Sequence, residues 1–186
     1  MKMKNSAKIL QLGFLLLVSS IGLYAQVPTK TPDQKSVQNL DTLGCAALGY
    51  DVVAFFTMPD KTIKGDPKFA SEFRGAKYWF SSEENKKAFD ASPSKYEPQF
   101  GGFCAFAITE GNLRPIQIWT HTIQDGKLIL NHNAKAKKLW DSKAGKNLKV
   151  ANKKWPVVEQ KPALYDFIHK GETQESVAAT SYKTDK

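Results

Sequence analysis

The chain has little arginine and none of the common catalytic signatures. Only Arg74 and Arg114 are arginines among its 27 basic residues. Proteins that read bases and phosphates usually cluster their cations and favour arginine, so the scattered lysines argue against nucleic-acid binding. The sequence also has no Gly-x-Ser-x-Gly elbow, no phosphate-binding glycine loop ending in Lys-Ser/Thr, and no His-Glu-x-x-His motif. These absences favour a binding or interaction role over catalysis, although they leave the enzymatic question open.

Long apolar runs are scarce in this chain, and the most prominent one lies near the N-terminus. Three lysines within the first eight residues precede the apolar run 9–18, and Ala25 places a small residue before a cleavage point at Gln26. This pattern predicts a signal peptide over residues 1–25. The run is shorter than the roughly 20 residues that span a bilayer, so we expect cleavage and no stable membrane insertion afterwards. Removing the three lysines lowers the formal net charge from +9 to +6. The expected location is extracytoplasmic, either periplasmic or secreted.

The remaining residues have the composition of one domain with polar ends. Residues 26–39 are polar and contain two prolines, which predicts a flexible lead-in. Residues 40–168 hold all four tryptophans, and large aromatic side chains supply much of a small domain's buried area. Residues 169–186 have few side chains to bury, which predicts a disordered tail. We therefore expect a single domain over residues 40–168.

Local patterns in the first half predict strands followed by a capped helix. The β-branched and aromatic run Val52–Thr57 predicts a strand buried on both faces. Residues 69–73 and 77–80 flank Arg74-Gly75-Ala76, which predicts a short hairpin. Ser81 and Glu84 have the spacing of a capping box, so a helix should begin at Ser82 and end before Pro93.

The second half predicts another hairpin and a helical region. Asp125-Gly126 between two apolar segments is typical of a two-residue hairpin turn, with Gln124 opposite Lys127 and Ile123 opposite Leu128. Continuing this register pairs His121 with Leu130 and places Trp119, His121 and His132 on the more apolar face. Apolar residues then recur at helical spacing from Trp140 to Trp155, with a possible break at Gly145 and an end at Pro156. The expected fold class is α+β: a small antiparallel sheet with hairpins, packed against a few short helices.

Several motifs together resemble the YHS-domain family in its exported bacterial branch. The matching segments are Ala47–Phe56 (Ala-Leu-Gly-Tyr-Asp-Val-Val-Ala-Phe-Phe), Gly75–Tyr78, the Ser81–Asn85 helix start, Pro93 with Tyr96, and Gly101–Ala105 (Gly-Gly-Phe-Cys-Ala). The resemblance covers roughly residues 40–156. It implies a small binding domain, and related domains look like metal handlers.

The chain departs from the metal-carrier pattern of that family at two positions. YHS domains that look like metal carriers place cysteines after the aromatic strand and at the start of the helix. Here Ser81 and Asn85 occupy those places. The resemblance therefore implies the domain type without supplying the family's thiolate pair.

Cys45 and Cys104 are the only cysteines. In an exported protein two thiols most often form a disulfide, which would close a loop of about sixty residues and contribute roughly 3–4 kcal/mol. Two alternatives remain: Cys104 is a free buried residue, or it is a ligand or reactive thiol.

A metal site is the sharper hypothesis. Copper(I) prefers thiolate and thioether ligands, whereas copper(II) and zinc accept imidazole. The candidate ligands are Cys104, His121 and His132, with Met58 as an additional thioether. A histidine on an apolar face is also often a core residue, and no Cys-x-x-Cys or His-x-x-x-His motif imposes ligand geometry.

Four other polar side chains are candidates for packing or capping. Asp51 enters an apolar segment, and we expect it to accept hydrogen bonds from nearby backbone amides, with a site carboxylate as the alternative. Tyr50, Tyr78 and Tyr96 are expected in the packing, with their hydroxyls at its edge.

These observations predict an exported, non-enzymatic YHS-type module that binds a small ligand or a metal ion, with copper or zinc as the candidate ions. One alternative is a structural domain that docks an exported protein partner without metal. A third is a thiol-dependent enzyme in which Cys104 and His121 act as nucleophile and base.

Overall fold

A computed structural model describes residues 37–160. They belong to the second of two units into which the chain divides, Lys35–Lys186. The expected signal peptide (1–25), most of the expected lead-in (26–39) and the expected tail (169–186) lie outside the described residues.

Four strands within residues 37–160 form two antiparallel pairs, which confirms the expected α+β class. β1 (Asp66–Phe73) pairs with β2 (Ala76–Phe80), and β3 (Gln117–Gln124) pairs with β4 (Lys127–Asn131). The helices are η1 (Ala47–Gly49), α1 (Ala54–Thr57), α2 (Glu83–Ala91), α3 (Pro93–Tyr96), η2 (Gln99–Gly102), α4 (Ala105–Thr109), α5 (Ala134–Asp141) and α6 (Ala144–Val158). In this part of the chain, no helix combines the length and apolar character needed to cross a membrane.

The first hairpin follows the prediction. Phe73 pairs with Ala76 across a two-residue turn made by Arg74 and Gly75. Both turn residues have positive φ, 51° and 82°, as a two-residue turn of this hand requires. Arg74 is an unusual choice there, because this conformation favours Gly, Asn and Asp.

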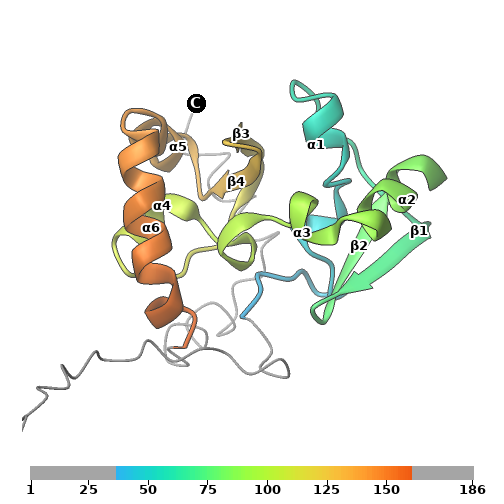
Figure 1. Ribbon diagram of the computed structural model, residues 1–186, viewed down its shortest axis with the longest axis horizontal. Helices are drawn as coiled ribbons and strands as arrows, with labels where there is room; N and C mark the ends of the chain where they lie inside the picture. The colour runs from blue at the N-terminus through green and yellow to red at the C-terminus, as the bar shows by residue number, and fades with distance from the viewer. Residues whose placement is uncertain (1–36, 161–186) are drawn as a thin grey trace, which may run out of the picture. The chain divides into compact units, whose positions relative to one another are not determined.

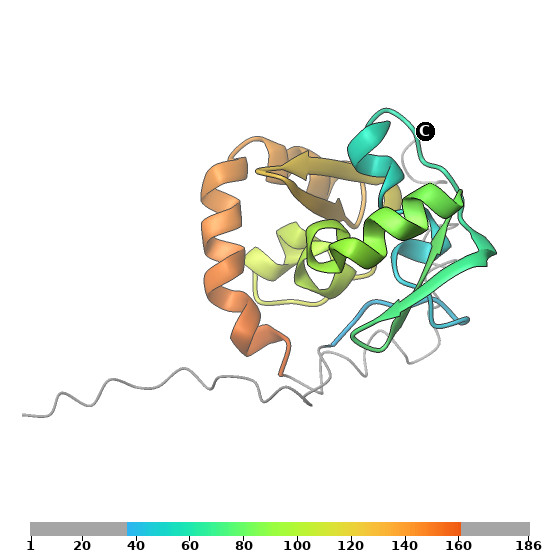
Figure 2. The same ribbon diagram turned by 45° about the vertical axis from the view of Figure 1, so that its right-hand side comes forward.

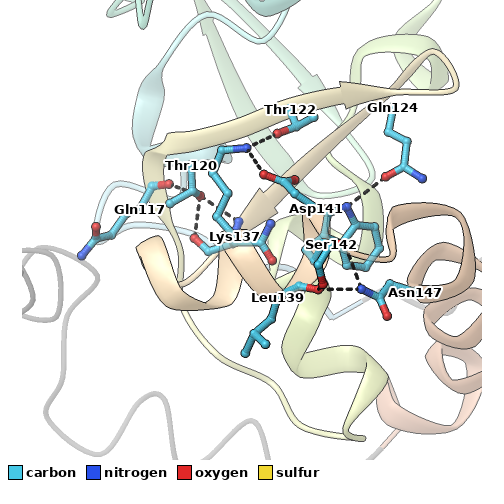
Figure 3. Close-up of polar contacts among 11 residues, drawn as sticks. Gln117, Thr120, Thr122, Gln124, Lys137, Leu139, Asp141, Ser142 and Asn147 are labelled. Carbon is cyan, nitrogen blue, oxygen red and sulfur yellow. Dashed lines mark hydrogen bonds and ion pairs between the residues drawn. The ribbon is translucent and has the colours of Figure 1, made fainter.

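The second hairpin follows the prediction only near its turn. Gln124 pairs with Lys127 and Ile123 with Leu128, but the register shifts before Thr122, and the predicted pairing of His121 with Leu130 does not continue the ladder. Thr120 lies in this irregular stretch and is fully buried. Its Oγ1 accepts from the backbone N–H of Asn131 at 2.8 Å and lies 2.7 Å from the carbonyl oxygen of that residue. It also lies 2.6 Å from the carbonyl oxygen of Gln117, beside which Figure 3 shows it. The threonine side chain thus replaces ladder hydrogen bonds that the bulge removes.

The strand predicted over Val52–Thr57 is wrong. The segment forms a turn followed by the short helix α1. Asp51 Oδ1 accepts from the backbone N–H groups of Val53 and Ala54, which starts a helical turn where β propensity favours an extended chain. The burial predicted for the segment Val52–Thr57 is correct for residues 52–55, which are all buried.

The start of α2 differs by one residue from the prediction. Ser82 is the N-cap, and its hydroxyl accepts from the backbone N–H of Asn85. Ser81 precedes the cap and directs its hydroxyl to Asp51 instead. The helix ends at Ala91, before Pro93, as predicted.

The predicted helical region becomes two helices, α5 and α6. Asn147 of α6 donates to the carbonyl oxygens of Leu139 and Trp140 at the end of α5, and Trp140 Nε1 donates to Gln124 Oε1 of β3 at 2.9 Å (Figure 3). The break precedes Ala144, so Gly145 lies inside α6. Pro156 also lies inside α6, near its end, and the chain stays helical to Val158; the predicted end at Pro156 is therefore wrong.

β4 contributes to two apolar clusters. Leu128 and Leu130 belong to the cluster that includes the first hairpin and α2, whereas Ile129 belongs to the cluster that includes α4, α5 and α6. This alternation is the one predicted for the strand. In Figures 1 and 2, the β1–β2 hairpin accompanies α2, and the β3–β4 hairpin lies on the side of α5 and α6.

Candidate ligand-binding site

His121 is held between two backbone carbonyl groups. Its Nε2 lies 2.6 Å from the carbonyl oxygen of Pro59, and its Nδ1 lies 3.2 Å from that of Ile118. Its ring also contacts Phe55, with 4.4 Å between the ring centroids. Trp119, which was expected to pack on the same apolar face, is 39% exposed. A metal ion needs a nitrogen lone pair, and both ring nitrogens of His121 already face oxygen atoms.

Cys104 and His132 come together through the main chain. The Cys104 thiol interacts with the backbone N–H groups of Ala107, Phe106 and His132, while the His132 side chain places Nδ1 3.0 Å from the carbonyl oxygen of Pro115. Burial raises the pKa of the Cys104 thiol, and the three backbone N–H groups lower it by a smaller amount. The thiolate is the form that binds metals and attacks substrates, so this surrounding suits an unreactive buried cysteine.

The three predicted metal ligands are not assembled into one centre. Within residues 37–160, no group of three or more His, Cys, Asp or Glu side chains is placed to hold a metal ion. Met58 precedes Pro59, so its segment approaches His121, while Cys104 and His132 meet at the end of β4.

Both cysteines are free thiols in the structure, so the expected Cys45–Cys104 disulfide is absent. Their surroundings differ. Cys45 lies near Asp41, Lys64 and Lys77, and burial, with a smaller contribution from Asp41, raises its pKa to about 11. The contacts of Cys104 involve α4 and the end of β4 instead.

Asp51 accepts hydrogen bonds with both carboxylate oxygens. In addition to the two amides at the start of α1, Oδ2 accepts from the Ser81 N–H at 2.7 Å, the Ser81 hydroxyl at 2.6 Å and Asn85 Nδ2 at 2.7 Å. Asp51 is fully buried. The predicted role as an acceptor for nearby backbone amides is confirmed. The structure adds that the two positions singled out in the YHS comparison converge on this carboxylate, with their side chains 3.4 Å apart.

A cavity of about 150 Å³ lies between the first hairpin, η2 and α6. We call it the Arg74 cavity. Its lining residues are Gln38, Ala46, Arg74, Tyr78, Glu97, Pro98, Gln99, Phe100, Gly101, Asn152 and Trp155.

The polar wall of the Arg74 cavity is built from an ion pair and a phenol. Arg74 Nη1 donates to Glu97 Oε1 at 2.8 Å, and Gln38 Nε2 donates to the Arg74 carbonyl oxygen at 2.6 Å. Burial raises the pKa of Glu97, and Arg74 opposes that rise. The Tyr78 side chain is only 3% exposed and lines the cavity, and its hydroxyl makes no hydrogen bond among the described residues. The fully buried side-chain atom without a partner in this part of the chain is Asn131 Nδ2 instead. Burial and the Glu97 charge raise the pKa of Tyr78, so its hydroxyl stays protonated and can donate.

The apolar wall comes from η2 and α6. The rings of Phe100 and Trp155 meet edge to face with their centroids 5.9 Å apart. Gly101 follows Phe100 with a φ of 59°, and a Cβ there would lie 2.2 Å from the carbonyl oxygen of Val37. Only glycine allows this close approach, which brings the segment containing Gln38 to the cavity.

Sequence reasoning did not find this site. Tyr78 was expected in the packing, and Arg74 was noted only as a turn residue and one of two arginines. A usable signal was present, because Arg74 stands before Gly75 at a turn position where Asn or Asp is preferred. No local sequence pattern indicated that Glu97 and Trp155 would line a cavity.

Comparisons with protein-family models, with curated proteins and with solved structures find no match to this chain. The resemblance to YHS domains therefore stays a prediction.

Proposed function

We propose that the chain is an exported, non-enzymatic domain of YHS type that binds a small molecule in the Arg74 cavity. The observation that carries the proposal is the Tyr78 phenol, a 3% exposed side chain on the wall of a cavity that also offers aromatic surface, whose hydroxyl makes no hydrogen bond among the described residues. Ligand pockets combine apolar walls with a few polar groups that fix orientation, so a phenol hydroxyl left free by the protein at such a wall is well placed to bind a ligand.

The size of the cavity limits the ligand. A cavity of about 150 Å³ holds a molecule comparable to benzene, whereas sites for drug-sized ligands exceed about 300 Å³. The lining contains no histidine, cysteine or serine that would supply a nucleophile with its base. Glu97 is held by Arg74, which suits recognition better than proton transfer.

The test is an NMR titration of the mature protein with four benzene derivatives of similar size: benzoate, benzamide, benzyl alcohol and benzylamine. We expect at least one probe to shift the signals of Tyr78 and Trp155. Asn152→Trp should weaken that binding at least tenfold, because residue 152 lines the cavity. Lys149→Trp is the matched control, since this exposed position of α6 is outside the lining. The proposal would be contradicted if Asn152→Trp left the affinity of the bound probe unchanged, or if no probe bound.

Metal binding is the competing proposal, and the structure offers it less support because the nitrogens of His121 face carbonyl oxygens. Copper and zinc titrations of the wild type and of the His121→Ala/His132→Ala variant decide the matter. Metal uptake that is lost in the double variant would favour the metal site over the Arg74 cavity.

A further inference from the structure

We propose that the ligand of the Arg74 cavity is a small monoanion, with a carboxylate directed at Arg74 and Tyr78 and a flat apolar body against Phe100 and Trp155. This inference rests on the proposed function and specifies the chemical class of its ligand. It follows from the hydrogen-bond donors, the local charge and the shape of the cavity.

Arg74 and Tyr78 form a wall of hydrogen-bond donors in the cavity. A guanidinium has five N–H donors, and the structure commits Nη1 of Arg74 to Glu97. The Tyr78 hydroxyl is a second donor, and its pKa is raised. A carboxylate accepts several hydrogen bonds at once, and those from a cation are about twice as strong as neutral ones. A ligand group that only accepts therefore fits this wall best.

The charges around the cavity leave one positive charge uncompensated. Arg74 and Glu97 line it, and Lys127 lies close enough to lower the pKa of Glu97. Two cations and one carboxylate sum to a single excess positive charge. An anionic ligand with one charge would neutralise the site, whereas a cationic ligand would increase the imbalance.

The opposite wall selects a flat apolar body. Phe100 and Trp155 present aromatic surface at an edge-to-face contact, and Pro98 adds an apolar surface beside them. Aromatic rings pack well in offset or edge-to-face arrangements with such walls. The volume admits one ring of the size of benzene with its substituent directed at the donors.

Backbone conformation gives independent support for a role of the Arg74 side chain. Arg74 has a φ of 51°, a conformation that Asn, Asp and Gly adopt more readily. Phe100, on the opposite wall, has a φ of 55°. Unfavourable backbone conformations are found preferentially at ligand sites, where the position of the side chain matters more than local stability.

The test compares the four probes in the same NMR titration, in which benzoate and benzamide form the isosteric pair. We expect benzoate to bind about tenfold more tightly than benzamide or benzyl alcohol, and benzylamine to bind most weakly, because one charge-assisted contact accounts for roughly that factor. The affinity for benzoate should fall as sodium chloride is raised, and that for benzamide should not.

Two variants test the donors. Tyr78→Phe should reduce benzoate affinity about fivefold without lowering thermal stability, because the removed hydroxyl lines the cavity and makes no hydrogen bond among the described residues. Arg74→Gln should abolish the preference for benzoate over benzamide. Lys149→Gln removes a positive charge on α6 outside the lining and should leave that preference unchanged.

The failures are distinguishable. Equal affinities for benzoate and benzamide, both weakened by Asn152→Trp, would overturn the monoanion inference and keep the small-molecule proposal. An unchanged benzoate affinity in Tyr78→Phe would remove the phenol from the site and overturn the assigned pose. If no probe binds, both proposals fail.

Discussion

The two hairpins use the same turn geometry with different residues. Arg74-Gly75 and Asp125-Gly126 both have positive φ at their two central positions, with 51° at the first residue in each case. Asp-Gly is among the preferred sequences for this turn, and Arg-Gly is not. The Asp125 turn is explained by local conformation alone. Local conformation does not explain arginine at the Arg74 turn. A role of its side chain on the wall of the Arg74 cavity does.

Each hairpin is also fixed by a buried polar side chain. The end of β2 is held through Ser81 by Asp51, which lies thirty residues earlier in the chain. The irregular part of β3 is held to β4 by Thr120. One anchor is an ionisable group with five donors around it, and the other is a neutral hydroxyl, so their removal should differ in cost.

The largest effect is expected for Asp51→Asn. The amide replaces an acceptor oxygen with a donor, which leaves buried N–H or O–H groups of Val53, Ala54, Ser81 or Asn85 without an acceptor. We expect a loss of about 3 kcal/mol in the free energy of unfolding, measured by urea denaturation with tryptophan fluorescence. Asp66→Asn, the same change at an exposed site, should cost less than about 0.5 kcal/mol. Equal losses in the two variants would show that the Asp51 contacts do not fix the first hairpin.

A smaller loss is expected for Thr120→Val. The valine keeps the shape but leaves the buried N–H of Asn131 without its acceptor, which should cost about 2 kcal/mol. Thr122→Val is the control, because this threonine is partly exposed and its hydroxyl accepts from the Lys137 ammonium (Figure 3). It should cost less than about 1 kcal/mol in the same denaturation experiment. A loss as large at residue 122 as at 120 would mean that the bulge is not what the hydroxyl supports.

Local patterns predicted those parts of the fold that depend on neighbouring residues. Both hairpin turns and the stop of α2 before Pro93 follow from turn and breaker chemistry within a few residues. Val52–Thr57 was predicted as a strand because burial of β-branched and aromatic residues does not distinguish a strand from a buried turn. The helical turn is started by the amides of Val53 and Ala54 on Asp51, and the same carboxylate is held by Ser81 and Asn85, which lie thirty or more residues away.

The candidate site was beyond reach for the same reason. Gln38, Arg74, Glu97 and Trp155 come from four segments that the fold brings to one cavity. Histidine and cysteine drew attention because their chemistry is recognisable in isolation, yet the surroundings of Cys104 and His121 are carbonyl groups, amides and apolar side chains. Chemical type identifies candidates, and only neighbours show whether a donor or a lone pair is available.

The smallest effects should have opposite signs at the two turns. Asp125→Arg places a less suitable residue at a positive φ and should lower the free energy of unfolding by about 0.5 kcal/mol. Arg74→Asn should raise the free energy of unfolding by about the same amount when both proteins also carry Glu97→Gln. The Glu97→Gln change is needed because Arg74→Asn alone would leave the Glu97 carboxylate without its ion-pair partner. The Arg74→Asn variant should also lose its preference for benzoate over benzamide in the NMR titration, whereas Asp125→Arg should keep it. If Arg74→Asn instead lowers stability, the arginine supports the fold, and its unusual turn position no longer argues for a ligand.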